Sequence, residues 1–458
     1  MRTKNLHLLL TLSFTVLINT FSLAQELPKT SREIPPKTEK DTKTISVNSI
    51  IDDAPVNTKP IDTTKQDSIK KSAFVKQLGN GFLPTKYFNF DLRYLIKYNQ
   101  YEAIRTGLGG VTNDAFSEKY RINGYTVYGF KDHRFKYSIG AGFRLAEKTN
   151  TWINLAYTND LQETGSTKFL TDKRFFQFFE PRLLNIDLFH KHVTKSISLQ
   201  HQLTPKLLTE TQFAVSNINP TYSYQYLFDN NLLNQFHLST ATLALQWSPF
   251  SNFDYVENKL VETKEGYPKF TLQFTNSFKN VFDSNIDFSK LDIRTLHKIH
   301  YKNEALSEIT LVSGITSENA PLTHLYHAYP NNITKETIMQ RFSVAGLNSF
   351  ETMFFNEFFS DKFTTFQLKH YLRPFKISER YQPQMVLITR YAIGNIKNPE
   401  RHQNVSFQSL KEGYTESGFE LNKLLFGFGL SFTYRYGAYH LPKTEDNIAL
   451  KFTFNVTL

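Results

Sequence analysis

The sequence lacks cysteine entirely and has only two tryptophans and four methionines among its 458 residues. The absence of cysteine excludes disulfides, thiolate metal sites, cysteine nucleophiles and lipid attachment at an N-terminal cysteine. After the N-terminal segment there is no run of 18 uncharged apolar residues, so we expect no membrane-spanning helix in the mature chain. Stability must therefore come from buried or closed secondary structure.

Motifs for chemistry are also missing. The sequence has no His-Glu-x-x-His, no Gly-x-Ser-x-Gly and no phosphate-binding glycine-rich loop before a helix. His190 and His192 would share one face of a strand, but without a third ligand we interpret them as a lumen-lining or exposed pair rather than a metal site. His324 and His327 would chelate together only in a helix. We therefore predict no metal, no cofactor and no enzymatic activity.

One carboxylate pair is a weak candidate for acid-base chemistry. Glu357 and Asp361 are four residues apart, so in a strand they would share a face at roughly 13 Å, which is too far for paired catalysis. We interpret them as a solvated pair. A hydrolytic site assembled at a barrel rim from distant strands stays open, because a single sequence does not reveal such a site.

The residues that are abundant are aromatic and basic. Phe (42) and Tyr (24) dominate an aromatic content of 15%, while the mean hydropathy of −0.40 is that of a polar protein. Strands with one apolar and one polar face produce this combination more readily than apolar helices. The formal net charge of +11 favours anionic lipid or anionic solutes as partners. Nucleic acid is not expected as a partner of an exported chain.

The N-terminus predicts export. Arg2 and Lys4 precede a mostly apolar stretch from Leu8 to Leu23, and Ser22-Leu23-Ala24 offers small residues at the positions that a signal peptidase reads. We predict a signal peptide over residues 1–24, which places the mature chain beyond the inner membrane of a Gram-negative envelope.

Residues 25–85 are predicted to form a disordered periplasmic tether. This segment is largely rich in Lys, Asp, Thr and Pro, and most of it has no aromatic residue. Within it, TISVNSII (residues 44–51) is β-prone and could pair with the sheet edge of a periplasmic partner. A mildly apolar piece of linker is the simpler interpretation.

Alternating apolar and polar residues begin near Tyr87 and recur to the end of the chain, which predicts β-strands. In FKYSIGAGFRLAE, Phe and Tyr stand at the ends of the apolar face, and the other face carries Lys, Arg, Ser and Gly. The clearest segments are residues 135–147, 239–247, 269–275 and 426–437. KDHR (residues 131–134) predicts a tight turn, and residues 317–347 form the longest irregular stretch.

The composition of the two faces predicts a transmembrane antiparallel β-barrel over residues 86–458. Apolar residues with aromatic ends suit lipid, and small or charged residues suit a lumen. Such a sheet must close, because open backbone groups in hydrocarbon cost several kcal/mol each. At about 23 residues per strand and connection, we expect about 16 strands, with 14 as the alternative. An even number places both barrel ends on the periplasmic side.

Several segments also resemble a large outer-membrane barrel family of unknown function from Gram-negative bacteria. The segments that carry the resemblance are YNQYEAIRTGLGGVTN (residues 98–113), YRINGYTVYGFKDHRFKYSIGAGFRL (120–145), FETMFFNEFFSDKFTTFQLKH (350–370), GYTESGFELNKLL (413–425), YRYGAYHLP (434–442) and DNIALKFTF (446–454). Members often carry a carboxypeptidase-regulatory-like domain before the barrel, which is not found here. The family barrel is distantly similar to the surface-antigen superfamily of outer-membrane assembly barrels. The resemblance implies no catalytic residue.

We therefore predict an integral outer-membrane β-barrel, with a pore or translocation role as the leading hypothesis. A structural or partner-binding barrel and a barrel-rim hydrolase acting on lipid or peptide are the alternatives. Four cationic residues share strand parity with small polar residues and are predicted to line the lumen, where they would favour anions. They are Lys136, Arg144, Arg435 and Lys451.

The final strand is predicted to close the barrel by pairing with the first strand, near residues 102–113. Its lipid-facing residues are Ile448, Leu450, Phe452, Phe454, Val456 and Leu458. This strand is also the predicted signal for the outer-membrane assembly machinery. Such chains usually end in an aromatic residue, so Phe454 or Phe452 would take the place of Leu458.

Overall fold

The structure is a computed structural model that describes residues 77–454 except 173, 175, 177–179, 257, 258, 338, 339, 342, 379, 380 and 426. The predicted signal peptide, the predicted tether up to residue 76, and Val456 and Leu458 lie outside the described residues. All described residues belong to one compact unit, residues 62–458.

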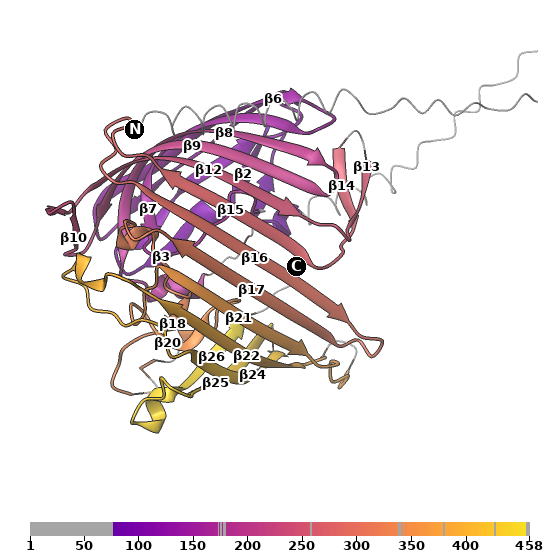
Figure 1. Cartoon of the computed structure of the whole chain (residues 1–458). Coiled ribbons are helices and arrows are strands. Elements are labelled where there is room, and N and C mark those ends of the chain that lie inside the picture. The colour runs from indigo at the N-terminus through magenta and orange to yellow at the C-terminus, as the bar shows by residue number, and fades with distance from the viewer. Residues whose placement is uncertain are drawn as a thin grey trace, which may run out of the picture. The chain divides into compact units, whose positions relative to one another are not determined.

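The main element is a sheet of 19 strands (Figure 1). Four of them are short: β1 (Phe82–Pro84), β2 (Phe88–Asp91), β3 (Ile96–Asn99) and β19 (Ser343–Val344). The other fifteen follow one another in chain order, each antiparallel to the next: β4 (Ala103–Thr112), β5 (Tyr120–Gly129), β6 (Arg134–Ala146), β7 (Thr151–Glu163), β8 (Phe189–Thr204), β9 (Leu207–Pro220), β12 (Phe236–Trp247), β15 (Lys269–Ser277), β16 (Phe288–His300), β17 (Leu306–Thr316), β21 (Lys362–Tyr371), β22 (Gln384–Asn395), β24 (Tyr414–Leu425), β25 (Phe428–Tyr436) and β26 (Ile448–Phe454). The prediction of an all-β fold built on one large antiparallel sheet is confirmed.

We call this curved sheet the wall. Its first strand position is occupied by two short strands in place of one. β2 and β3 pair with opposite ends of β4, and the 3₁₀ turn η1 (Leu92–Tyr94) lies between them. Asp91 caps that turn by accepting the backbone N–H of Arg93 at 3.0 Å. β1 pairs antiparallel with β2, so the last residues of the range predicted as a tether are part of the sheet.

The last strand does not pair with residues 102–113, contrary to the prediction. Both edges of β4 are taken, one by β5 and the other by β2 and β3. β26 pairs with β25 on one edge, and on its other edge with the short strand β19, in parallel. A 3₁₀ turn, η2 (Pro181–Leu184), contacts both β3 and β19. Among the described residues, the first and last wall strands are therefore joined through η2 and β19.

The connections between strands differ in length at the two ends of the wall. We call one end the loop end, because it carries the long connections 164–188, 221–235, 317–361 and 396–413. The other, the turn end, has several short connections, and also the hairpin of β13 (Asn252–Val256) and β14 (Lys259–Lys264). The predicted turn KDHR is found between β5 and β6.

The long connections contain short elements of their own. They are β10 (Gln225–Phe228), β11 (Asn231–Leu233), η3 (Leu322–His324), β18 (Pro330–Asn332), β20 (Phe350–Phe354), η4 (Pro399–Arg401), β23 (His402–Gln403) and η5 (Thr444–Asn447). In the part of the chain that the structure describes, no helix has the length and apolar character needed to cross a membrane.

Burial along the wall strands is inverted relative to that of a soluble protein. In β6, Phe135 and Ile139 are 66% and 62% exposed, while Lys136 between them is only 4% exposed. β26 repeats this, with Leu450 and Phe452 exposed and Lys451 and Thr453 buried. The apolar face of the wall therefore points outward and the polar face inward.

The strand predictions agree with the structure, apart from one boundary. The segments 135–147, 239–247 and 269–275 lie almost wholly within β6, β12 and β15. Gly427, predicted inside a strand, is instead the turn residue between β24 and β25, with a φ of +82° that non-glycine residues rarely adopt. The alternation of apolar and polar residues continues through this turn, so the sequence pattern did not reveal it.

The outward face gives a direct test of the wall. Ile139→Arg should reduce the free energy of folding into lipid bilayers by about 2–4 kcal/mol, because an outward side chain at the strand centre would face hydrocarbon in a transmembrane wall. The measurement is a urea titration of tryptophan fluorescence in large vesicles. Ile377→Arg, an equally exposed position in the connection after β21, is the matched control and should change stability by about 1 kcal/mol or less. Equal effects at both positions would contradict a lipid-facing wall.

Candidate functional site

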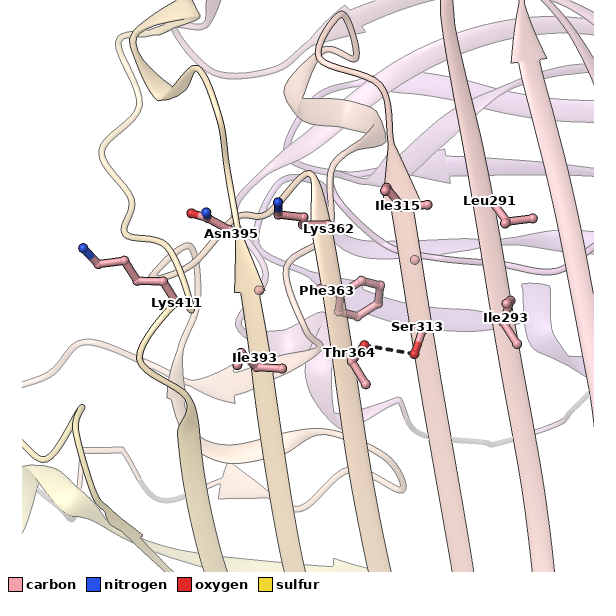
Figure 2. Close-up of a pocket in the computed structure, with 12 residues that line it drawn as sticks. Leu291, Ile293, Ser313, Ile315, Lys362, Phe363, Thr364, Ile393, Asn395 and Lys411 are labelled. Atoms are coloured by element: carbon pink, nitrogen blue, oxygen red, sulfur yellow. Dashed lines mark hydrogen bonds between the residues drawn. The ribbon is translucent and has the colours of Figure 1, made fainter.

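The outward face carries a groove near the loop end of β16, β17, β21 and β22 (Figure 2). Its volume is about 470 Å³. Branched apolar side chains of β16, β17 and β22 line it, and Lys362, Asn395 and Lys411 lie at the end nearest the connections.

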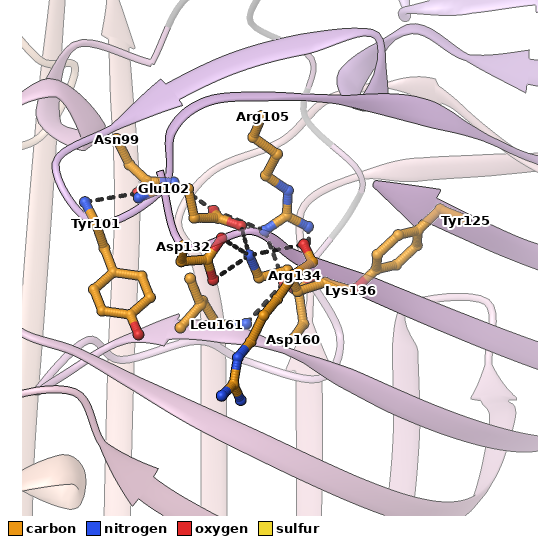
Figure 3. A network of polar contacts seen from close by, with 10 residues as sticks. All are labelled: Asn99, Tyr101, Glu102, Arg105, Tyr125, Asp132, Arg134, Lys136, Asp160 and Leu161. Carbon is orange, nitrogen blue, oxygen red and sulfur yellow. Dashed lines mark hydrogen bonds and ion pairs between the residues drawn. The ribbon is translucent and has the colours of Figure 1, made fainter. Parts of the chain in front are cut away.

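The inward face is concave enough to bring distant strands into contact (Figure 3). Arg105 of β4 donates to both carboxylate oxygens of Asp160 of β7, at 2.7 and 2.8 Å, across the two intervening strands. The hydroxyl of Tyr125 on β5 donates to the same carboxylate. Neighbouring strands are about 4.8 Å apart, so these side chains meet only because the wall curves around them.

A second ion cluster lies beside this pair. The Lys136 ammonium is 2.6 Å from Glu102 and 2.6 Å from Asp132, and Glu102 is fully buried (Figure 3). Asn99 also donates to Glu102, at 2.6 Å. Buried charges must be paired in this way to avoid the cost of desolvation.

The described residues of two long connections lie inside the wall. We call those of 164–188 inner loop 1. Its backbone at Leu170 donates to Gln273 of β15 at 2.8 Å, and Asp172 pairs with Arg294 of β16. Further along, Arg174 donates to Asp91 of β2 at 2.6 Å. Inner loop 1 therefore spans the interior from the middle of the strand order to its first strand.

Residues 317–361, which we call inner loop 2, are held by the last wall strands. The Glu416 carboxylate of β24 accepts the backbone N–H groups of Glu351 and Thr352, both at 2.9 Å, and pairs with Arg390 of β22 at 2.7 Å. All of these residues are almost completely buried. Tyr326 of the same loop donates to Asp292 of β16 at 2.8 Å. Inner loop 2 thus bridges the wall from β16 to β26.

Three of the four residues predicted to line the lumen are buried on the inward face and have carboxylate partners. Lys451 is 3.0 Å from Glu351, and Arg435 binds Glu357 with two hydrogen bonds of 2.7 and 3.2 Å. Lys136 has the partners described above. Arg144 is partly exposed near the turn end, where it lies over the Trp152 ring.

A hydrophobic cap covers part of the loop end. It joins the small sheet of β10, β11 and β23 to inner loop 2 through buried aromatic residues such as Tyr226 and Phe359. The Tyr224 hydroxyl contacts His402 Nδ1 at 2.8 Å and accepts the backbone N–H of Leu322 at 2.9 Å. Cap and inner loop 2 therefore pack as one body.

Between the inner loops and the wall remains an enclosed space of about 210 Å³. Its lining includes Arg294, Tyr329 and Gln367. Side chains of both inner loops and of the wall strands line this space.

Neutral histidines fasten inner loop 2. His327 Nδ1 accepts the backbone N–H of Tyr329 at 3.0 Å, so its Nε2–H donates to Glu163, at 2.7 Å. Burial lowers the pKa of His327, although the Glu163 carboxylate opposes the change. Burial also lowers the pKa of His324 to about 3, assisted by Lys290, and that of His402 to about 4, assisted by Arg401.

The histidines and acids singled out in the sequence do not assemble a metal or catalytic site. The rings of His190 and His192 are 6.5 Å apart on β8, while His327 binds Glu163 as described. Within the described ranges, no group of three or more His, Cys, Asp or Glu residues is placed to hold a metal ion. Glu357 pairs with Arg435, whereas Asp361 accepts the backbone N–H of Lys397 at 2.8 Å.

The residues that hold inner loop 2 were not identified from the sequence. Arg390 and Glu416 lie on the inward parity of β22 and β24, which is the only signal that pointed to them. The partners that they contact are far away in the sequence, so their pairing could not be read from spacing.

Comparisons with known proteins identify no family. No family model and no curated protein matches the sequence. Among solved structures, BamA from Haemophilus ducreyi lacking POTRA domains 1–3 is similar over 84% of this chain and 77% of that chain, with 10% identity and a TM-score of 0.49. CdiB from Acinetobacter baumannii matches 78% of this chain and 57% of its own, with 10% identity and a TM-score of 0.39. CdiB from Escherichia coli matches 77% of this chain and 60% of its own, with 8% identity and a TM-score of 0.41.

These similarities concern the fold. At TM-scores below 0.5 they define no activity, substrate or partner for this chain.

The buried ion cluster on β6 generates a stability prediction. Lys136→Met should lower the free energy of unfolding by about 3 kcal/mol, because both Glu102 and Asp132 lose their ammonium partner, while Glu102 keeps only Asn99 and the longer contact with Arg105 at 3.3 Å. Lys376→Met removes a pair whose side chains are both about half exposed, and should change it by about 0.5 kcal/mol or less. Chemical denaturation in detergent or lipid measures both, and similar losses would contradict the cluster's structural role.

The buried histidines predict acid sensitivity. Their folded pKa values lie below the unfolded value of about 6.5, so their contribution to stability is complete above that pH and declines as pH falls below it. Protonating His327 Nδ1 also breaks its bond with the Tyr329 N–H. We therefore expect faster hydrogen exchange of residues 322–332 at pH 5 than at pH 7.5, after correction for intrinsic rates.

Two variants test the assignment. His327→Gln should weaken this pH dependence, whereas His300→Gln, at an exposed turn-end position, should leave it unchanged. Protection that is equal at the two pH values in the unsubstituted protein would refute the assignment.

Proposed function

We propose that this chain is an integral outer-membrane β-barrel of the pore or translocation type, and that its described conformation is a closed state. The observation that carries the proposal is the combination of an apolar outward face with a charged interior occupied by inner loops 1 and 2.

The outward face supports membrane residence. Monomeric soluble proteins rarely expose continuous apolar patches larger than a few hundred Å², whereas strand after strand here exposes Leu, Ile, Phe and Tyr. Transmembrane barrels have this alternation, and their long loops lie on the extracellular side. The loop end is then extracellular, and the turn end, where β1 and β2 enter the wall, faces the periplasm.

The interior argues against a permanently open pore. Inner loop 1 crosses it, and inner loop 2 is bound to wall strands from β16 to β26. Because Lys136, Arg435 and Lys451 are neutralised by carboxylates, they give no reason to expect anion preference. Passage through the barrel then requires inner loop 2 to leave its position, which breaks the two backbone hydrogen bonds that Glu416 accepts from it.

Other roles are less supported. A filled interior also suits a structural barrel, which would never conduct. A rim hydrolase would need a nucleophile, a base and an acid. Ser307 lies 2.8 Å from His370 Nδ1, but in the part of the chain that the structure describes no carboxylate hydrogen-bonds to that histidine. We propose no catalytic function. Lipid, the assembly machinery acting on the C-terminal strand, and a periplasmic protein bound to residues 25–85 are the proposed partners.

A gated barrel should open when the attachment of inner loop 2 is weakened. In Glu416→Gln, the carboxylate that accepts two backbone N–H groups and balances Arg390 becomes a neutral amide. We expect low conductance for the unsubstituted protein in planar bilayers and at least tenfold more frequent openings for this variant. Glu412→Gln, an exposed position in the connection before the same strand, is the matched control and should behave like the unsubstituted protein.

A reversible cross-link shows whether the openings come from inner loop 2. The chain has no cysteine, and Val344 of β19 lies opposite Phe452 of β26. In Glu416→Gln carrying Val344→Cys and Phe452→Cys, oxidation should abolish the openings and a reductant should restore them. A protein that inserts into bilayers but never conducts in any of these forms would contradict the gated barrel and favour a structural role.

A further inference from the structure

The groove on the outward face arises from a local change in side-chain size. Two small polar residues, Ser313 of β17 and Thr364 of β21, occupy outward positions between larger ones on the flanking strands. The larger residues are Leu291 and Ile293 of β16 and Ile393 of β22 (Figure 2). Ser313 and Thr364 hydrogen-bond to each other at 3.0 Å, so the floor needs no other polar partner. The result is a trough of about 470 Å³ in an apolar wall.

The loop end of this trough is cationic. Lys362 and Asn395 are exposed there, and among the described residues no carboxylate lies within ion-pair distance of Lys362. Lys411 has only Glu412, at 3.8 Å, and both side chains are mostly exposed, so this pair is weak. The carboxylate of Asp361, next to Lys362, is buried and accepts a backbone N–H instead.

We propose that this groove binds a phosphate-bearing lipid of the outer leaflet, with an acyl chain in the trough and its phosphate groups at the loop end, where Lys362 and Lys411 lie. The inference rests on the proposed membrane location, which places the loop end at the extracellular surface. The order of chemistry along the groove, apolar toward the strand centres and cationic toward the loops, matches the direction of a lipid in that leaflet. Ammonium groups form strong hydrogen bonds with phosphate oxygens.

A neutral lipid fits less well, because it brings no anionic group to the two lysines. A zwitterionic phospholipid also fits less well, because its own ammonium group already balances the charge of its single phosphate. Free phosphate would use the lysines but not the trough. The site therefore predicts a preference that depends on both ends of one molecule, the phosphate group and the acyl chain.

The test is native mass spectrometry of the detergent-solubilised full chain with three probes: lipid A, the same lipid after removal of its phosphates, and inorganic phosphate. We expect retention of lipid A at least tenfold above its dephosphorylated form, and no retention of phosphate alone. Lys362→Gln with Lys411→Gln should abolish the preference. Lys397→Gln, a rim lysine paired with Glu318 and not part of the groove lining, is the matched control and should preserve it.

A second variant separates the trough from the charge. Ser313→Leu fills the floor while leaving both lysines, so it should reduce retention of both lipid forms severalfold. Equal retention of lipid A and its dephosphorylated form by the unsubstituted protein would overturn the inference, as would undiminished preference in the double lysine variant.

The membrane assignment is checked separately. Heat-modifiable migration and tryptophan fluorescence report whether each variant is folded. A chain that folds into bilayers without lipid preference refutes only the lipid site. A chain that stays folded in water without lipid or detergent refutes the proposed function as well.

Discussion

The structure depends on one constraint, which is that the charged inward face of the wall must be neutralised away from water. A Lys, Arg or Glu on that face cannot be left unpaired, because an uncompensated buried charge costs several kcal/mol. The inner loops supply the missing partners: Glu351 and Glu357 for the cations of the last strands, and backbone N–H groups for Glu416. Inner loop 2 in turn is held by the wall strands and by the hydrophobic cap. Wall and filling therefore stabilise each other.

The same dependence explains how the first and last wall strands are joined among the described residues. A free strand edge needs partners for its N–H and C=O groups, above all in hydrocarbon. β19 belongs to inner loop 2 and η2 to inner loop 1, so the segments that fill the interior also lie between β26 and β3. A movement of inner loop 2 away from Glu416 would consequently expose the edge of β26 as well as empty part of the interior.

Much of the wall could be predicted from the sequence, because side-chain direction in a strand has a period of two. Lys136 and Phe135 could be assigned to opposite faces from parity alone. The pairing of β4 with β2 and β3 could not, because residues 88–99 contain a turn that breaks the alternation. The partners of Arg390, Arg435 and Lys451 were equally inaccessible, since the chain segments that meet in the interior are separated by up to about a hundred residues and nothing in local spacing encodes them.

The parity argument also shows why a charged lumen and an open pore are different predictions. Parity says which side chains face inward, but conduction depends on whether their charges face water or one another. Here three of the four cations predicted from parity meet carboxylates, and the partners Glu102 and Glu351 are as buried as the cations they pair with. Such buried pairs contribute little to stability, but removing one partner is strongly destabilising because it leaves the other charge unpaired. That asymmetry is consistent with the proposed closed barrel, in which opening would depend on the contacts that join the filling to the wall, such as those of Glu416.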